Sequence, residues 1–198
     1  MKIARLLLGG LATACVMLGQ ALACGQERWS VKVLGDHDAS QIHKTAETET
    51  VAHLGSKDFA NPTNLDRHHH KDTRIGPQEL TTYKVRGLLK GFLKEGDEDY
   101  HIVITDEQDH QKTMIVEIPA ADCVSDAKLK KHVEQFRTRF AKKYGEPPTT
   151  IKWMPTPLKP IVFRGIGFFD VKHGTPQHGV APNGMELHPV IGMSLNPH

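Results

Sequence analysis

The sequence predicts a mainly β protein in which five strands close into a small barrel that carries one long helix. Three observations lead to this prediction. Apolar and polar residues alternate in three segments between residues 81 and 118, one segment ending at residue 144 repeats apolar residues at helical spacing, and two strand-like segments follow. A chain of 198 residues, 38% of them hydrophobic, can bury one sizeable core, so we expect one domain with terminal additions.

The first 23 residues have the three parts of a cleaved secretory signal. Two basic residues precede an apolar stretch at residues 6–18, and Ala21-Leu22-Ala23 follows. The stretch is too short to read as a membrane span. We therefore predict an exported protein, periplasmic or secreted, with no integral membrane span after cleavage.

Cleavage after Ala23 leaves Cys24 at the new amino terminus. A lipoprotein signal prefers leucine three residues before such a cysteine, and Ala21 stands there instead, so we favour soluble export over lipid attachment. Cys24 and Cys123 remain after the leader is removed. They can pair in an oxidising compartment only if their Cα atoms lie within about 7 Å, and the sequence leaves this pairing open.

Residues 24–80 are predicted to form an irregular N-terminal extension. Within it, Trp29, Val31 and Val33 alternate as in a short strand. Three consecutive histidines at 68–70 lie in a polar run, which we interpret as solvated surface rather than as a metal site.

The charge of the mature chain disfavours a nucleic-acid partner. Removal of the leader lowers the count of Lys and Arg from 25 to 23, which equals the 23 acidic residues. A nucleic-acid binder of this size usually shows a basic excess or stripe. All 13 histidines lie after the leader, so mild acid is expected to make the protein cationic.

The barrel domain is predicted to cover residues 81–198, beginning with three strands. The first covers 81–93, where Gly87 or Gly91 permits a bend. Residues 100–104 and 114–118 form the second and third strands, because apolar side chains alternate there with others.

The long helix follows the third strand. Ser125 is the predicted N-cap, and Gly145 with the prolines after it ends the helix. Apolar residues recur at helical spacing: Leu129, Val133, Phe136, Phe140 and Tyr144. Its other face is basic, which we interpret as solvated surface rather than as a phosphate-binding face.

The fourth and fifth strands are predicted at residues 161–169 and 185–193, with Pro189 indicating an edge or a bulge. The order of elements is then strand, strand, strand, helix, strand, strand. That is the order of the OB-fold, a five-stranded Greek-key barrel in which the loops after the first and fourth strands flank the usual binding face.

Both of these loops carry polar chemistry, so we predict that carboxylates and imidazoles converge at the barrel mouth. Such a mixture suits a divalent metal better than a bare polyanion. The predicted metal ligands are His173, His178 and His188. The predicted ligand-binding residues are Asp99, His101, Asp170 and Asn183, and the predicted catalytic residues are Glu186 and Glu117. The alternative is that the acidic turn is a soluble hairpin and that the histidines only cap loops.

Two functions remain open from the residues alone. The first is an exported binding module that holds a small ligand, a glycan or a divalent metal at the barrel mouth. The alternative is a metal-dependent phosphodiesterase or nuclease-like hydrolase, in which Glu186 or Glu117 accepts a proton from a metal-bound water. The sequence contains no P-loop, G-x-S-x-G, C-x-x-C or H-E-x-x-H motif, so those enzyme classes lose support.

Three segments resemble an uncharacterised family of exported bacterial proteins with an OB-fold-like barrel. They are DEDYHIVI at 97–104, TMIVEIP at 113–119, and 165–190 with its ELHPV block. The resemblance extends from Thr81 to the carboxyl end and implies membership and export, but no reaction. Staphylococcal-nuclease-like barrels share only the order of elements, so no catalytic residue is carried over from them.

Overall fold

The computed structural model describes residues 24–25, 27–171 and 178–197, so the predicted leader and His173 lie outside the described residues. The helices are α1 (Trp29–Lys32), α2 (Val51–Leu54), α3 (Asn64–His69) and α4 (Ala127–Tyr144). The strands are β1 (His43–Thr50), β2 (Thr81–Lys94), β3 (Tyr100–Thr105), β4 (Thr113–Ile118), β5 (Lys152–Trp153), β6 (Lys159–Phe169) and β7 (Met185–Ser194). Short 3-10 helices cover Ala39–Gln41, Pro77–Leu80 and Ala121–Cys123.

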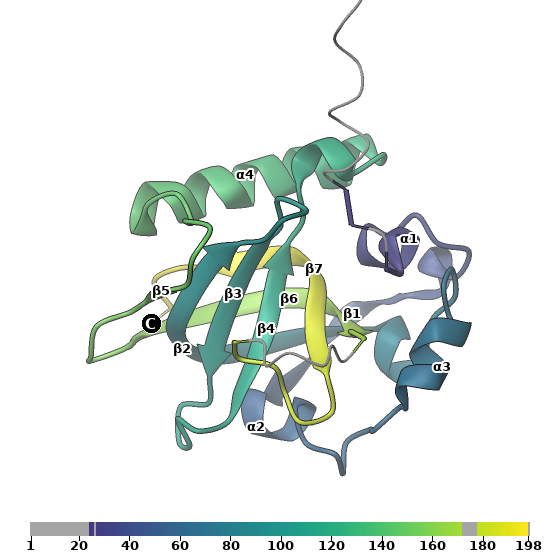
Figure 1. The fold of residues 1–198 in the computed structure, drawn as a ribbon, viewed down its shortest axis with the longest axis horizontal. Coiled ribbons are helices and arrows are strands. Elements are labelled where there is room, and N and C mark those ends of the chain that lie inside the picture. Colours follow the sequence, from purple (N-terminus) through teal and green to yellow (C-terminus); the bar gives the residue numbers. More distant parts are fainter. Residues whose placement is uncertain (1–23, 26, 172–177, 198) are drawn as a thin grey trace, which may run out of the picture.

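Five of the strands close into a barrel in the order β2, β3, β4, β7, β6 and back to β2 (Figure 1). The pair β4 and β7 is parallel, and the other neighbouring pairs in the ring are antiparallel. The long helix α4 lies between the third and fourth of these strands along the chain. The predicted fold class, a mainly β protein with an OB-fold-like barrel, is confirmed.

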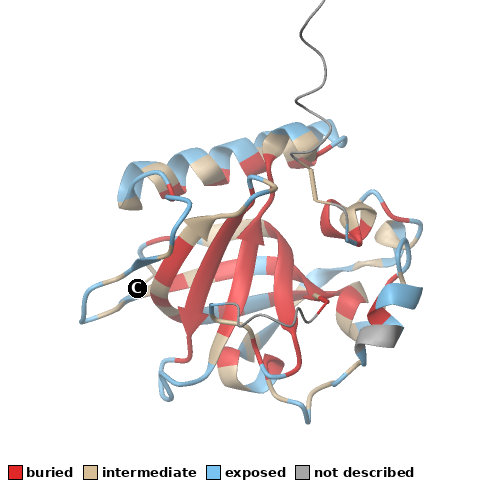
Figure 2. Ribbon diagram, viewed as in Figure 1, coloured by how far each residue is buried: buried red, intermediate tan, exposed pale blue. Residues whose placement is uncertain are grey.

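Helix α4 lies across one end of the barrel and buries its apolar face against it (Figure 1). The Phe140 ring contacts the Phe92 ring edge-on at 5.1 Å, and Figure 2 shows the buried strands beneath the helix. The predicted N-cap at Ser125 is wrong by one residue. The carboxylate of Asp126 accepts a hydrogen bond from the Leu129 amide at 2.7 Å, and a carboxylate is as good a cap as a hydroxyl.

The N-terminal extension consists of short elements joined by turns. Residues 29–33 do not form the predicted strand, because the Arg28 carbonyl accepts hydrogen bonds from the amides of Val31 and Lys32 and closes the single turn of α1. A disulfide between Cys24 and Cys123 joins the start of the extension to the segment before α4, with their Cα atoms 5.6 Å apart. This pairing resolves the question that the sequence leaves open.

A buried ion pair also attaches the extension to the barrel. The Arg28 guanidinium donates to both carboxylate oxygens of Glu79, at 2.7 and 2.6 Å. The same carboxylate accepts hydrogen bonds from the amides of Ile75 and Phe169, and Glu79 is fully buried. Glu79 therefore connects three separate segments of the chain.

Replacing Glu79 is expected to destabilise the fold strongly. The Glu79→Ala change leaves the Arg28 charge buried without its carboxylate and should lower the free energy of unfolding by about 3–5 kcal/mol. The matched control is Glu107→Ala, which breaks an ion pair with Arg86 whose side chains are 41% and 40% exposed, at a cost of about 1 kcal/mol or less. Urea denaturation of both variants measures the difference, and equal losses would contradict the expectation.

None of the helices in the described part of the chain is long and apolar enough to cross a membrane.

Candidate functional site

Polar side chains gather on the outer face of strands β3, β4 and β7. Tyr100 and Ile102 of β3 belong to the barrel core, so His101 between them faces outward. The same alternation turns other polar residues outward, namely Glu117 on β4 and Glu186 and His188 on β7. The site therefore lies on the side of the barrel and not at the predicted mouth, because the strand register sends these residues away from the interior.

Other elements cover this face and bury it. Helix α1 contributes Lys32, the β2–β3 turn contributes three carboxylates, and the residue after β6 contributes one more. We call the whole group the polar cluster: Lys32, Glu95, Asp97, Asp99, His101, Glu117, Asp170, Glu186 and His188. Glu95 of the loop after the first barrel strand and the His178 carbonyl of the loop after the fourth both contact His101, so these two loops meet at one site, as the OB-fold order predicts.

The Glu117 carboxylate lies at the centre of the polar cluster. Its Oε1 is 3.2 Å from Nδ1 of His101, and its Oε2 is 2.7 Å from Nδ1 of His188 and 3.8 Å from Nζ of Lys32. Oε1 of Glu95 lies 2.9 Å from the same His101 nitrogen. Asp99 Oδ2 is 3.5 Å from Nε2 of His188. One carboxylate therefore faces two imidazoles, each of which also faces a second carboxylate.

Several buried atoms of the cluster have no hydrogen-bond partner among the residues that the structure describes. They include both ring nitrogens of His188, whose side chain is fully buried; its Nδ1 lies 2.7 Å from Glu117, but the two groups are not aligned as in a hydrogen bond. They also include one oxygen each of Asp99, Glu117 and Glu186. A buried polar atom without a partner costs about 1–3 kcal/mol, and here such atoms face one another. An arrangement of this kind suits a cation held between lone pairs.

Among the residues that the structure describes, two sets of three side chains each bring three possible ligand atoms within 4.8 Å of one another. One set is Glu95, His101 and Glu117, and the other is Asp99, Glu117 and His188. Ligand bonds of about 2.1 Å place neighbouring donor atoms roughly 3.0–3.4 Å apart, which resembles the spacings found here. Imidazole and carboxylate donors together suit first-row divalent ions such as Zn²⁺ or Mn²⁺. These buried groups could hold a metal ion.

The orientation of His101 supports such a role. Its Nε2 lies 2.9 Å from the His178 carbonyl, and as the protonated nitrogen it donates to that oxygen. Nδ1 is then the nitrogen that faces Glu95 and Glu117. A backbone carbonyl that fixes the second ring nitrogen in this way is a common feature of histidine metal ligands.

The charges of the cluster perturb one another. Burial opposes a charge on Lys32, but Glu117 and Asp170 raise the pKa of its ammonium group overall. Burial also opposes ionisation of Glu117, yet Lys32 and His101 hold its pKa well below the usual range. Burial and the Glu117 charge raise the pKa values of Asp99 and Glu186 well above normal. Glu117 therefore ionises more readily than Asp99 or Glu186.

The two imidazoles behave differently. Burial disfavours the charged ring of His101, but the carboxylates of Glu117 and Glu95, which accept hydrogen bonds from the ring, raise its pKa to about 11. A metal ion at Nδ1 therefore has to displace the proton that this nitrogen carries. Burial lowers the pKa of His188, and Glu117 offsets this only in part. His188 is therefore a neutral imidazole at pH 7, which is the form that binds metals.

Two of the predicted site residues lie apart from the cluster. Asn183 is buried, and its amide donates to the carbonyls of Leu54 and Ser56 while its oxygen accepts from the Met185 amide, so it supports the backbone. The ring of His178 packs edge-on against Trp153 at 5.3 Å, and only its carbonyl reaches the cluster. Lys32 was not among the predicted site residues, because the strand predicted around residues 29–33 gave no reason to place its side chain in the polar cluster.

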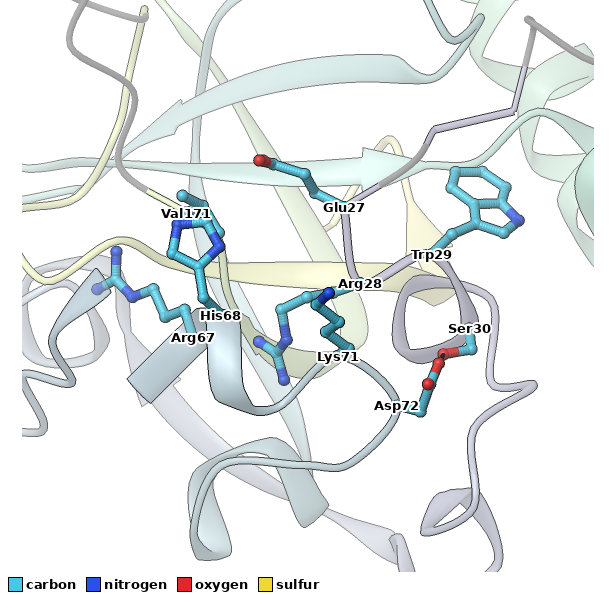
Figure 3. Close-up of a pocket in the computed structure, with 9 residues that line it drawn as sticks. All are labelled: Glu27, Arg28, Trp29, Ser30, Arg67, His68, Lys71, Asp72 and Val171. Atoms are coloured by element: carbon cyan, nitrogen blue, oxygen red, sulfur yellow. Dashed lines mark hydrogen bonds between the residues drawn. The ribbon is translucent and has the colours of Figure 1, made fainter. Parts of the chain in front are cut away.

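A separate pocket of about 410 Å³ lies between the N-terminal segment and α3, and Figure 3 shows its lining residues. At one rim, the Ser30 hydroxyl donates to Asp72 at 2.7 Å. The Arg28 guanidinium in its wall is bound to Glu79 and to the Thr73 carbonyl. These polar groups of the pocket already have hydrogen-bond partners within the protein, so the pocket offers fewer groups for a ligand than the polar cluster does. We therefore place the candidate site in the polar cluster.

The fold and the site together define an OB-fold-like barrel with a buried histidine and carboxylate cluster on its outer face. No family model, curated protein or solved structure matches the chain.

Proposed function

We propose that this protein is an exported binding module that holds a divalent metal ion at Asp99, Glu117 and His188. The observation that carries the proposal is His188, a fully buried imidazole between two carboxylates: its Nδ1 lies 2.7 Å from Glu117 without the alignment of a hydrogen bond, and its Nε2 lies 3.5 Å from Asp99. A cation held by these three side chains satisfies their buried lone pairs together.

Export is part of the proposal and has two supports. The first 23 residues have the pattern of a cleaved secretory signal. The disulfide between Cys24 and Cys123 is of the kind that persists in oxidising compartments, and it engages the thiol that a lipid anchor would need. Both favour a periplasmic or secreted protein of the exported family that the C-terminal block resembles.

An acidic surface leads towards the cluster. A shallow pocket of about 650 Å³ at the β2–β3 turn is lined by Glu95, Asp97 and Glu98, among others. Lys94 also lines this pocket and pairs with Glu98, but the carboxylates outnumber it, and a mainly acidic concave surface raises the local concentration of cations. Glu95 belongs both to this pocket and to the cluster, and its side chain is 30% exposed, so a cation has a route inward.

Binding is a better proposal than hydrolysis of a phosphodiester. The side chains of Asp99, Glu117 and His188 are at most 4% exposed, so a bulky substrate has no access to an ion among them. The acidic turn would also repel a phosphate group. A small organic ligand or a glycan is less suited, because the atoms without partners are mainly lone-pair acceptors in a tight space.

The proposal is tested by metal analysis and thermal denaturation of protein purified without an affinity tag. We expect bound metal in the native protein, and after chelation and dialysis we expect Zn²⁺ or Mn²⁺ to raise the melting temperature. At a concentration one hundred times the dissociation constant the gain is about 2.7 kcal/mol, which corresponds to roughly 5–10 °C for a chain of this size.

The variants His188→Ala and Asp99→Asn should lose this temperature shift. The matched control is His110→Ala, which removes an exposed imidazole from the turn between β3 and β4. Circular dichroism establishes whether each variant folds. If His188→Ala does not fold, Asp99→Asn still tests the site, because this substitution preserves the size of the side chain. An unchanged melting temperature of the wild type across a panel of divalent ions would refute the proposed function.

A further inference from the structure

We infer that the polar cluster holds two divalent ions and that the Glu117 carboxylate bridges them. The inner ion lies at Asp99, Glu117 and His188, and the outer ion at Glu95, His101 and Glu117. This inference rests on the proposed function and deepens it, because it gives the number of ions and the role of each ligand.

The two oxygens of Glu117 face different imidazoles. Oε1 lies 3.2 Å from His101, whereas Oε2 lies 2.7 Å from His188. Each set of ligand atoms contains one histidine and one further carboxylate, and only Glu117 belongs to both sets. A carboxylate that binds two ions through its two oxygens has this arrangement, and bridged ions in proteins are typically about 3.5–4 Å apart.

The register of the sheet produces this geometry. His101 on β3 pairs directly with Glu117 on β4, so their side chains leave the same face as neighbours. On the other side of β4, Ile115 pairs with Glu186 and Val116 with Leu187 of the parallel strand β7. Glu117 therefore lies on the central strand, between the imidazoles that β3 and β7 contribute.

The composition of the cluster also suits cations. It contains six carboxylates, namely Glu95, Asp97, Asp99, Glu117, Asp170 and Glu186. Among the described residues, Lys32 acts on most of them, and Arg67 acts on Asp170 and Glu186 from the edge. The carboxylates thus outnumber these lysine and arginine side chains, and metal ions that bind here displace the protons that the metal-free cluster holds.

The two positions differ in their contact with solvent. Glu95 of the outer set is 30% exposed and borders the acidic pocket, whereas Asp99 and His188 of the inner set are fully buried. An ion with an exposed side can retain water and exchange, and a closed site holds its ion as part of the structure. The outer ion should therefore be the one that a chelator removes first.

The experiment counts Mn²⁺ ions bound to the full mature chain with its disulfide intact. Isothermal titration and metal analysis of chelator-treated protein should give two ions for the wild type. His101→Ala and Glu95→Gln should each retain one ion, at the inner position, and His188→Ala should lose the inner one. His110→Ala should bind two, because its imidazole lies outside the cluster.

Electron paramagnetic resonance gives a readout that a purely structural effect of these substitutions would not produce. The wild type with two Mn²⁺ should show the spectrum of a spin-coupled pair, whereas Glu95→Gln should show that of isolated ions. One ion in the wild type, with no coupled spectrum at any ratio, overturns the inference and leaves the proposed function intact. No bound ion at all overturns both. The wild-type count and spectrum decide the matter even if a histidine variant fails to fold.

Discussion

Removal of the disulfide is expected to lower the free energy of unfolding by about 3–5 kcal/mol. Cys24 and Cys123 are 99 residues apart, so the bond restricts a long segment of the unfolded chain, and the loss of entropy on closing such a loop is large. For a protein of this size the change corresponds to a fall in melting temperature of roughly 10 °C or more. The Cys24→Ser, Cys123→Ser double variant and urea denaturation measure it.

The double variant also supplies the control for chemical reduction. Dithiothreitol should lower the stability of the wild type to that of the variant and should leave the variant unchanged. The disulfide lies eight residues before Lys32, so the variant should also hold α1 less firmly against the cluster. A loss below about 1 kcal/mol would show that Arg28 and Glu79 alone hold the extension in place.

The barrel could be predicted because the residue pattern within each strand indicates a strand without reference to the rest of the chain. In β3 and β4 the apolar residues recur at every second position, and these positions do form the core. Glu117 and His188 were predictable as site residues for the same reason, since each interrupts an apolar strand. It could not be predicted that these residues lie on a buried outer face of the barrel. The alternation of apolar residues assigns side chains to the two faces of a sheet, but it does not show which other elements cover the outer face.

The parts that were missed depend on contacts distant in sequence. Strand β1 has mostly polar, exposed residues, and it is a strand because its backbone pairs in parallel with β2. Helix α1 is held by a disulfide and by the Arg28 pair with Glu79, 51 residues away. The residues near Lys32 in the sequence do not indicate that Cys123 and Glu79 are the partners that hold this helix. The position of that lysine therefore became known only from the structure.

The Lys32→Met variant is expected to be less stable without metal and to bind metal more tightly. The Lys32 ammonium lies 3.8 Å from Glu117 and 3.9 Å from Asp170, so its removal takes a buried positive charge away from both carboxylates. Breaking a buried pair in this way costs about 3–5 kcal/mol. The thermal midpoint of the chelated variant should fall accordingly, whereas Lys128→Met on the exposed face of α4 should change it little.

The metal response of the same variant separates two accounts of the cluster. Two unit charges about 4 Å apart interact by about 4 kcal/mol at an effective dielectric constant of 20, so Lys32 opposes any divalent ion bound to Glu117. Its removal should therefore strengthen Mn²⁺ binding at least about tenfold, and saturating metal should restore most of the lost stability. If Lys32 is instead the permanent counter-ion of these carboxylates, the variant will be destabilised and Mn²⁺ will not rescue it. Titration calorimetry and thermal denaturation of one variant thus distinguish a metal site from an internal salt-bridge network.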